Sequence, residues 1–242
     1  MHACLESFIH MDVDKFKDWF YTRIEHFSLR WNQLMASGSW YKSFAELDVS
    51  EREGVSFQRT LQKRRSRIAI IAPHGGGIEP GTSEIAYAVA GSQFSYYTFE
   101  GLKPRGNEIL HITSTLFDEP KCLQLVQDTE IVIAIHGCDG EEKVIHVGGL
   151  HVELKTRLIQ SLAQDGFEAR LAEVRLSGNQ IQNICNRGQS NQGIQLEITT
   201  GLRRAMFRKL DRQGRNFSTD IFRRFVTSVR KELLLAAKEL KL

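Results

Sequence analysis

Several features that mark other classes of protein are missing from this chain of 242 residues. It has only four cysteines (Cys4, Cys122, Cys138 and Cys185), and no two form a CxxC pair. Neither a disulfide framework nor a cysteine-rich zinc finger is therefore supported, and a reducing compartment is the simpler expectation. No uninterrupted apolar run reaches the roughly 18 residues of a membrane span, and the first residues lack the apolar region of a signal peptide. We expect a cytoplasmic protein without a membrane partner, which cell lysis would release.

A strong net charge is also missing. The formal charge is +3 at pH 7, which argues against nucleic acid as a partner. Basic residues do cluster locally, at residues 63–67 and in the stretch after Thr200, where Arg203, Arg204 and Arg215 are found. Such clusters are most often solvated ends of helices and loops. The functional interpretation is attraction of a polyanion, either nucleic acid or an acidic polymer.

The composition is that of an ordinary soluble domain. Hydrophobic residues make up 41% of the chain and charged residues 25%, which excludes disorder, collagen-like repeats and a coiled coil. The length suits one domain, and we expect a monomer. An aromatic-rich pattern at residues 13–35 predicts an N-terminal helix, which a Ser-Gly-Ser break at residues 37–39 ends. We therefore place a helical extension at residues 1–40 and a single domain at residues 41–242.

Strands alternate with helices along this domain. Residues 68–72 and 131–135 are continuous apolar runs, typical of strands buried on both faces of a sheet. Further strands are expected at residues 93–99, 174–176 and 193–198, and helices at residues 83–90 and 150–163. A long amphipathic helix, capped by Ser218, Thr219 or Asp220, ends the chain. The alternation predicts an α/β fold with a mixed, largely parallel sheet flanked by helices.

The two apolar runs each end at a histidine, His74 and His136. Buried strands in an α/β sheet bring such side chains together at one edge. Two histidines and a carboxylate form the His₂Glu ligand set of a catalytic zinc, which keeps its fourth position for water. His74, Glu79 and His136 fit that set. Glu84 stays open as the carboxylate ligand, although a helix first turn suits a glutamate without any metal.

Other residues have both a functional and a purely structural interpretation. The three glycines after His74 could cradle an anion, but no Gly-Lys-Ser/Thr follows them. Cys138 is a conceivable thiol nucleophile, although buried cysteines at strand ends are usually inert. His111 and His146 are candidates for an outer-shell or substrate role, or are simply hydrogen-bonded residues of a loop or strand.

Glu197 and Arg187 are the remaining candidates. Glu197 alternates outward on an apolar strand, so it is either part of a solvated face or a general base that takes a proton from water and passes it to a leaving nitrogen. Arg187 could hold a substrate carboxylate through its bidentate guanidinium.

Four segments together resemble the poly-γ-glutamate hydrolase family. They are residues 70–86, which contain Pro-His-Gly-Gly-Gly-Ile-Glu-Pro-Gly-Thr-Ser-Glu, and residues 99–103, 110–115 and 132–138. Members are phage-encoded enzymes and bacterial, often prophage-like, proteins. The resemblance runs from about Tyr41 to the C-terminus, which makes residues 41–242 the catalytic domain and leaves residues 1–40 outside it.

The resemblance implies a fold similar to carboxypeptidase A and one zinc ion held by two histidines and a glutamate. Carried over to this chain, the ligands are His74 and Glu79 of the Pro-His-Gly-Gly-Gly-Ile-Glu motif and His136 of Ile-His-Gly. Glu197 matches the general-base glutamate of carboxypeptidase-like enzymes by its strand context. The implied activity is hydrolysis of γ-glutamyl amide bonds in an anionic capsule polymer with free α-carboxylates, which Arg187 would bind.

The leading hypothesis is therefore a zinc-dependent hydrolase of poly-γ-glutamate or related glutamate-rich amides. One alternative keeps the zinc ion but changes the substrate to an N-acyl amino acid or a short peptide, as for an amidohydrolase or carboxypeptidase. Another is a non-enzymatic, phage-related protein that binds nucleic acid through the basic segments near Arg64 and Arg204.

Overall fold

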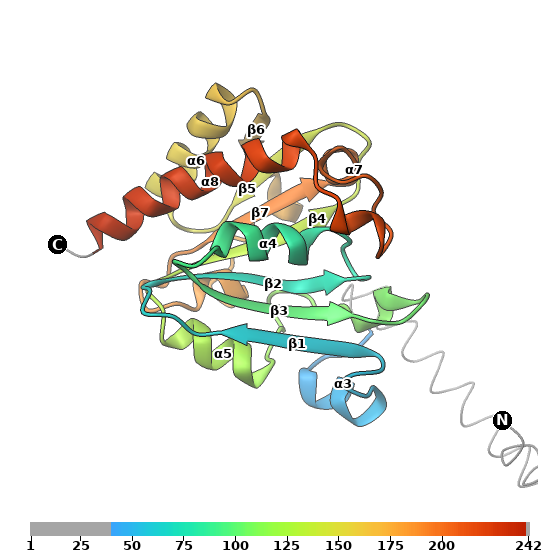
Figure 1. Ribbon diagram of the computed structural model, residues 1–242. Helices are drawn as coiled ribbons and strands as arrows, with labels where there is room; N and C mark the ends of the chain where they lie inside the picture. Colours follow the sequence, from blue (N-terminus) through green and yellow to red (C-terminus); the bar gives the residue numbers. More distant parts are fainter. Residues whose placement is uncertain (1–39, 241–242) are drawn as a thin grey trace, which may run out of the picture.

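The computed structural model describes residues 40–240 (Figure 1). The helix predicted at residues 13–35 lies outside the described residues. One seven-stranded sheet runs through the described part, with strand order β1-β3-β2-β4-β7-β5-β6. Its strands are β1 (Phe57–Gln62), β2 (Ile68–Gly76), β3 (Ser95–Gly101), β4 (Ile131–Cys138), β5 (Val144–Gly148), β6 (Glu168–Leu171) and β7 (Ile194–Thr199).

Most neighbouring strands are parallel. Parallel pairing joins β3, β2, β4 and β7, and also β5 to β6. Antiparallel pairing joins β1 to β3 and β5 to β7. The predicted mixed, largely parallel sheet is therefore confirmed.

Helices cover both faces of the sheet (Figure 1). One side carries α4 (Thr82–Ala90), α6 (Val152–Gln164) and α8 (Asp220–Glu239), and the other carries α3 (Phe44–Ser50) and α5 (Pro120–Gln127). The alternation of side chains along β2 explains the two layers, because Ile68 and Ile70 join the core under α4, α6 and α8, whereas Ala69 and Ile71 join the core on the α5 side. A short helix, α7 (Thr200–Met206), follows β7 directly.

The predicted elements are largely found, with one correction. The segment Val174–Leu176 is a single turn of 3₁₀ helix (η3), not a strand. Three residues are too few for a pattern to distinguish the two. The turn pairs with no strand of the described part, and its Leu176 carbonyl accepts a hydrogen bond from the Gln195 side chain on β7. Strands β1, β5 and β6 were not predicted, because polar residues interrupt each of them. The final helix begins as expected, with the Thr219 side chain accepting a hydrogen bond from the Phe222 backbone N–H. Within residues 40–240, no helix is both long and apolar enough to cross a membrane.

The sheet topology decides where a site can form. From β2 the chain continues to β3 on one side, and β4 lies on the other side of β2. Such a reversal leaves a crevice at the carboxyl ends of the two strands, where ligands bind in open α/β sheets. Both strand-end histidines lie at this point: His74 on β2 and His136 on β4.

Candidate metal centre

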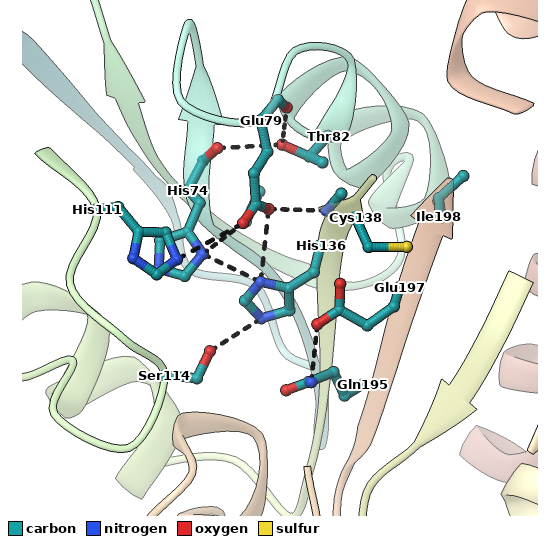
Figure 2. A network of polar contacts seen from close by, with 12 residues as sticks. His74, Glu79, Thr82, His111, Ser114, His136, Cys138, Gln195, Glu197 and Ile198 are labelled. Carbon is teal, nitrogen blue, oxygen red and sulfur yellow. Dashed lines mark hydrogen bonds and ion pairs between the residues drawn. The ribbon is translucent and has the colours of Figure 1, made fainter. Parts of the chain in front are cut away.

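His74 lies at the end of β2 and is only 1% exposed. Its Nε2 lies 2.7 Å from the carbonyl oxygen of Ile112. Because a carbonyl only accepts hydrogen bonds, Nε2 carries a hydrogen, and Nδ1 is the ring nitrogen that faces the other side chains. It lies 2.9 Å from Glu79 Oε1 and 3.1 Å from His136 Nδ1 (Figure 2).

The glycines after His74 allow this arrangement. The parallel register between β2 and β3 shifts between Ala72 and Gly75. A Cβ on Gly75 would lie 2.1 Å from the Ser83 hydroxyl, and Gly76 has φ +65° in the left-handed region. Side chains at these positions would push the strands apart or strain the backbone. The chain therefore turns tightly enough for Glu79 to reach back to His74, and the Glu79 N–H donates to the His74 carbonyl at 2.9 Å.

The Glu79 carboxylate links the two histidines. Besides the contact with His74, its Oε2 accepts a hydrogen bond from the Gly137 backbone N–H at 2.8 Å and lies 3.5 Å from His136 Nδ1. Burial alone would raise the pKa of Glu79, but the charges and hydrogen bonds of His74 and His136 hold that pKa well below its usual value. The carboxylate is therefore ionised and available as a ligand.

His136, at the end of β4, completes the triangle. Its Nε2 lies 3.3 Å from the Ser114 hydroxyl. Burial lowers the pKa of this ring, yet the hydrogen bond and charge of Glu79, with the charge of Glu197, raise it above the usual value overall. The surroundings thus favour a positive charge between these side chains.

The donor set fits a zinc ion. Zinc takes imidazole nitrogen and carboxylate oxygen in tetrahedral geometry at roughly 2.0–2.2 Å, which requires ligand atoms about 3.4 Å apart. The three distances among His74 Nδ1, Glu79 and His136 Nδ1 are 2.9, 3.1 and 3.5 Å. A single cation at the centre would contact all three lone pairs at once.

His111 offers a second possible third ligand. Ligand atoms of His74, Glu79 and His111 all lie within 4.8 Å of one another. The His111 ring lies against that of His74, with centroids 3.9 Å apart, and its Nε2 is 3.8 Å from Glu79 Oε1. An outer-shell or substrate role was one expectation for this residue, and its position suits either that role or ligation.

Glu197 lies beside the three donors. It is the register partner of His136 across the β4–β7 pairing and is 8% exposed. All of β7 is buried, so the solvated-face interpretation does not hold. Burial, with the nearby charge of Glu79, raises the pKa of Glu197 to about 7. Such a carboxyl can both take and release a proton near neutral pH. Figure 2 shows the Glu197 carboxylate next to the His136 ring.

Gln195 fixes one oxygen of Glu197. Its Nε2 donates to Glu197 Oε1 at 2.9 Å and to the Leu176 carbonyl at 3.2 Å. Asn183 Nδ2 donates to Gln195 Oε1 at 2.9 Å, which sets the orientation of the glutamine amide. The other oxygen of Glu197 is thereby left for the cavity. Sequence reasoning missed this pair of amides, because nothing in the local pattern joins residues 183 and 195.

A cavity of about 520 Å³ opens over the donors. This volume lies within the usual range for small-ligand sites. The cavity is lined by the histidines and glutamates described above, which are His74, Glu79, His111, His136 and Glu197. Its other walls come from residues 113–115, 137–139 and 174–180, Asn183 and Gln195.

Arg187 does not line this cavity. Its guanidinium donates to the carbonyl oxygens of Gln182, Phe117 and Thr115 at 2.7, 3.0 and 2.7 Å. These bonds hold the loop that carries Ser114 and Thr115, and they use up the face that a substrate carboxylate would need. The position of Arg187 gives no support to the predicted substrate contact.

Two further candidates do not suit the predicted chemistry. Glu84 is in the first turn of α4, as expected, and its Oε1 accepts from Arg215 Nε at 2.7 Å. It is therefore paired with a cation of the protein, and Glu79 is the carboxylate that faces the histidines. Cys138 does line the cavity, but burial and the charge of Glu197 raise the pKa of its thiol to about 11. A protonated thiol is a poor nucleophile.

Arg203 is a buried cation that sequence reasoning placed in a basic cluster. It is 4% exposed, and its guanidinium donates to the carbonyl oxygens of Pro80 at 2.8 Å, Cys138 at 3.1 Å and Ile198 at 3.0 Å. These carbonyls belong to the loop after Glu79 and to the ends of β4 and β7. Arg203 therefore fastens together the three segments that carry the site. Arg215 is also buried, whereas Arg204, Arg208, Lys209 and Arg212 are exposed, so only part of the stretch after Thr200 presents cations to solvent.

The chain is similar to proteins of one known family. The family model for poly-gamma-glutamate hydrolase matches residues 41–228. The SPbeta prophage-derived protein YoqZ of Bacillus subtilis (strain 168) is 41% identical over 187 residues, which are 76% of this chain and 67% of that protein. YndL of the same organism is 38% identical over 169 residues, covering 69% of this chain and 66% of YndL. The chain thus spans about two thirds of the length of these relatives.

Two solved structures share the fold. A bacteriophage poly-gamma-glutamate hydrolase superposes with a TM-score of 0.79 at 32% identity, covering 81% of this chain and 97% of the phage chain. A structure of YndL, described as the zinc-free apo form, superposes with a TM-score of 0.78 at 35% identity, covering 81% of this chain and 98% of that one.

Proposed function

Because this chain belongs to the poly-gamma-glutamate hydrolase family, we propose that it is a zinc-dependent hydrolase that cleaves γ-glutamyl amide bonds of poly-γ-glutamate or related glutamate-rich amides. The observation that carries the proposal is the convergence of His74, Glu79 and His136 on one point beside Glu197. The description of the YndL structure as zinc-free supports zinc as the metal. We assign the catalytic domain to residues 41–242, with residues 1–40 as an extension.

In this proposal His74, Glu79 and His136 bind the metal, and Glu197 transfers the proton. A zinc ion bound by His74, Glu79 and His136 would polarise the scissile carbonyl and acidify a water molecule next to it. Glu197 would accept the proton of the attacking water on the oxygen that Gln195 leaves free, so that the water oxygen bonds to the carbonyl carbon as the C=O π bond opens. The protonated Glu197 returns the proton to the leaving nitrogen as the amide C–N bond breaks. A pKa of about 7 for Glu197 suits both steps.

The chain's own groups prepare this reaction. Gly137 N–H holds Glu79 Oε2, the Ile112 carbonyl holds His74, and the Ser114 hydroxyl faces His136 Nε2. Contacts of this kind around metal ligands set the ring orientation and the basicity of the donors. The centre is therefore pre-formed, which reduces the reorganisation needed during catalysis.

Metal content and turnover, measured on the same preparations, test the proposal. We expect about one zinc per chain in the wild type after reconstitution, almost none in His74→Ala, and wild-type zinc in Glu197→Gln. The wild type should release new amine ends from poly-γ-glutamate, and Glu197→Gln should lower kcat at least about 100-fold. Absence of zinc from the reconstituted wild type, or full activity of Glu197→Gln, would overturn the mechanism.

A panel of substrates distinguishes this proposal from the alternative hypothesis of a zinc hydrolase that acts on N-acyl amino acids or short peptides. The same preparations are given N-acyl amino acids and short α-linked peptides at matched concentration. Faster release of amine from these than from poly-γ-glutamate would leave the metal chemistry in place and change the substrate.

A further inference from the structure

Arg175 is an unpaired cation at the cavity that His74, Glu79 and His136 also line. It lies in η3, and its side chain is among those that line the cavity. Of the cavity-lining residues within the described part of the chain, it alone carries a guanidinium or ammonium group. The carboxylates of Glu79, Asp139 and Glu197 line the same space. An anionic substrate entering this cavity therefore meets one permanent positive charge supplied by the protein.

The loop that carries Arg175 is fixed by its backbone. Gly149 N–H donates to the Ser177 carbonyl at 2.8 Å, and Asn186 Nδ2 donates to the carbonyls of Gly178 and Gln180 at 2.7 and 2.9 Å. A Cβ on Gly148 would lie 2.3 Å from the Ser177 carbonyl oxygen, so the loop packs closely on β5. Within residues 40–240, the exposed Arg175 guanidinium makes no hydrogen bond or ion pair with another residue. A fixed backbone with an unengaged charged side chain is suited to binding a ligand.

The same loop is tied to Glu197. Leu176, the next residue after Arg175, accepts a hydrogen bond on its carbonyl from Gln195 Nε2, and that nitrogen also donates to Glu197 Oε1. One amide group thus sets the position of the Arg175 backbone relative to the Glu197 carboxylate. The backbone from which the Arg175 side chain extends and the proton acceptor are therefore held in a fixed relation.

We propose that Arg175 binds the free α-carboxylate of a glutamyl residue next to the scissile amide, and thereby selects γ-glutamyl chains whose α-carboxylates are unmodified. This rests on the proposed function and assigns its substrate contact to Arg175 in place of Arg187. A guanidinium offers two parallel N–H donors to a carboxylate, which gives direction as well as charge. A carboxamide presents one acceptor and no charge, so it loses most of that interaction.

Binding without turnover tests the assignment. The zinc-loaded Glu197→Gln protein is titrated by calorimetry with a γ-linked glutamate tetramer, and with the same tetramer in which every α-carboxylate is a carboxamide. We expect Arg175→Gln, added to Glu197→Gln, to weaken binding of the carboxylate tetramer about tenfold or more. Binding of the carboxamide tetramer should change less than about twofold. Equal weakening for both tetramers would overturn the proposal.

Two further variants sharpen the result. Arg170→Gln removes an exposed charge on β6 that is paired with Glu168 and lies outside the cavity, so it should leave both affinities unchanged. An equal loss in Arg170→Gln would mean that long-range charge, not a contact, is responsible. A selective loss in Arg187→Gln, with none in Arg175→Gln, would return the role to Arg187.

Turnover distinguishes this inference from the proposed function. In the active enzyme, which retains Glu197, the single substitution Arg175→Gln should raise KM for the carboxylate tetramer by about the same factor as it weakens binding. It should leave zinc content unchanged. If the wild type binds the carboxylate tetramer through Arg175 but does not cleave it, the proposed function fails and the inference stands. If the enzyme cleaves the carboxylate and carboxamide tetramers equally well, the proposed function stands and the inference about Arg175 fails.

Discussion

The guanidinium of Arg203 lies directly against the backbone of Gly137, so that a Cβ on Gly137 would be 2.6 Å from Arg203 Cζ. Gly137 in turn donates its N–H to Glu79 Oε2 at 2.8 Å. The buried cation therefore supports the position of the Glu79 carboxylate through a single peptide unit. Any side chain at residue 137 would force the guanidinium to shift.

Gly137→Ala should disturb the metal centre through this contact. We expect an unfolding free energy lower by about 1–3 kcal/mol, because the added methyl forces Arg203 away from its carbonyl partners. Zinc affinity should fall about tenfold, as for other residues that orient metal ligands. Urea unfolding of the metal-free protein and competition with a zinc chelator measure the two effects.

A double-mutant cycle supplies the control for Gly137→Ala. In an Arg203→Met background the methyl group meets a flexible side chain, so the further loss of zinc affinity should be smaller. If Gly137→Ala costs as much zinc affinity in that background as in the wild type, Arg203 does not act on Glu79 through Gly137.

The third ligand is decided by comparing two histidines. His136 Nδ1 is 3.1 Å from His74 Nδ1 and 3.5 Å from Glu79 Oε2, whereas His111 Nε2 is 3.8 Å from Glu79 Oε1. We expect His136→Ala to lose nearly all bound zinc after dialysis and His111→Ala to keep it. Mass spectrometry of the metal provides the measurement. Loss in His111→Ala with retention in His136→Ala would make His74, Glu79 and His111 the ligand set.

The sequence predicts the strand-end histidines because the features that place them are local. The apolar runs before His74 and His136 are long enough to be read as buried strands, and parallel strands end at the same edge of a sheet. Glu79 follows His74 within one glycine-rich turn, so its proximity is also a local property. Prediction of Glu197 near them needed only its strand and the family resemblance.

The contacts that organise the site could not be predicted in this way. Arg203 looks like one more charge in a basic stretch, and its burial depends on a glycine 66 residues earlier in the chain. Arg175 lies in three residues that resemble a short strand, but they form a 3₁₀ turn, and carbonyls in and after this turn accept hydrogen bonds from the Gln195 and Asn186 side chains. Arg187 has the right chemistry for a carboxylate, but three carbonyl oxygens already occupy it. These outcomes are set by tertiary partners, which periodicity does not reveal.

Glu197 should destabilise the metal-free protein at neutral and alkaline pH. Its pKa is about 7 in the folded chain, against 4.5 for an ordinary glutamate. Below pH 4.5 both states are protonated and there is no penalty. As the pH rises above 4.5 the unfolded state releases the proton first, so stability falls until about pH 7 and then stays level. The full penalty is on the order of 3 kcal/mol.

Glu197→Gln removes that penalty. After zinc is stripped with a chelator, the variant should be more stable than the wild type at pH 8, and the difference should vanish near pH 4.5. Urea unfolding at several pH values measures it. A stability difference that does not change with pH would show that Glu197 titrates normally in the folded protein.

Gln195 should affect the pKa of Glu197 without affecting zinc binding. Its hydrogen bond to Glu197 Oε1 favours the ionised carboxylate and so lowers the pKa of Glu197. Gln195→Leu removes the donor at similar volume, so we expect the acidic limb of the kcat/KM profile to move to higher pH, with zinc content unchanged. The Leu176 carbonyl also loses its partner, which should raise KM because Arg175 is next to it.

Gln192→Leu is the matched control, since Gln192 is exposed in the loop before β7 and does not line the cavity. It should leave the pH profile, KM and zinc content as in the wild type. If Gln195→Leu lowers kcat/KM equally at every pH, the amide acts only on the shape of the cavity. A shift of the acidic limb in Gln195→Leu that is absent in Gln192→Leu instead indicates that Gln195 changes the affinity of Glu197 for its proton.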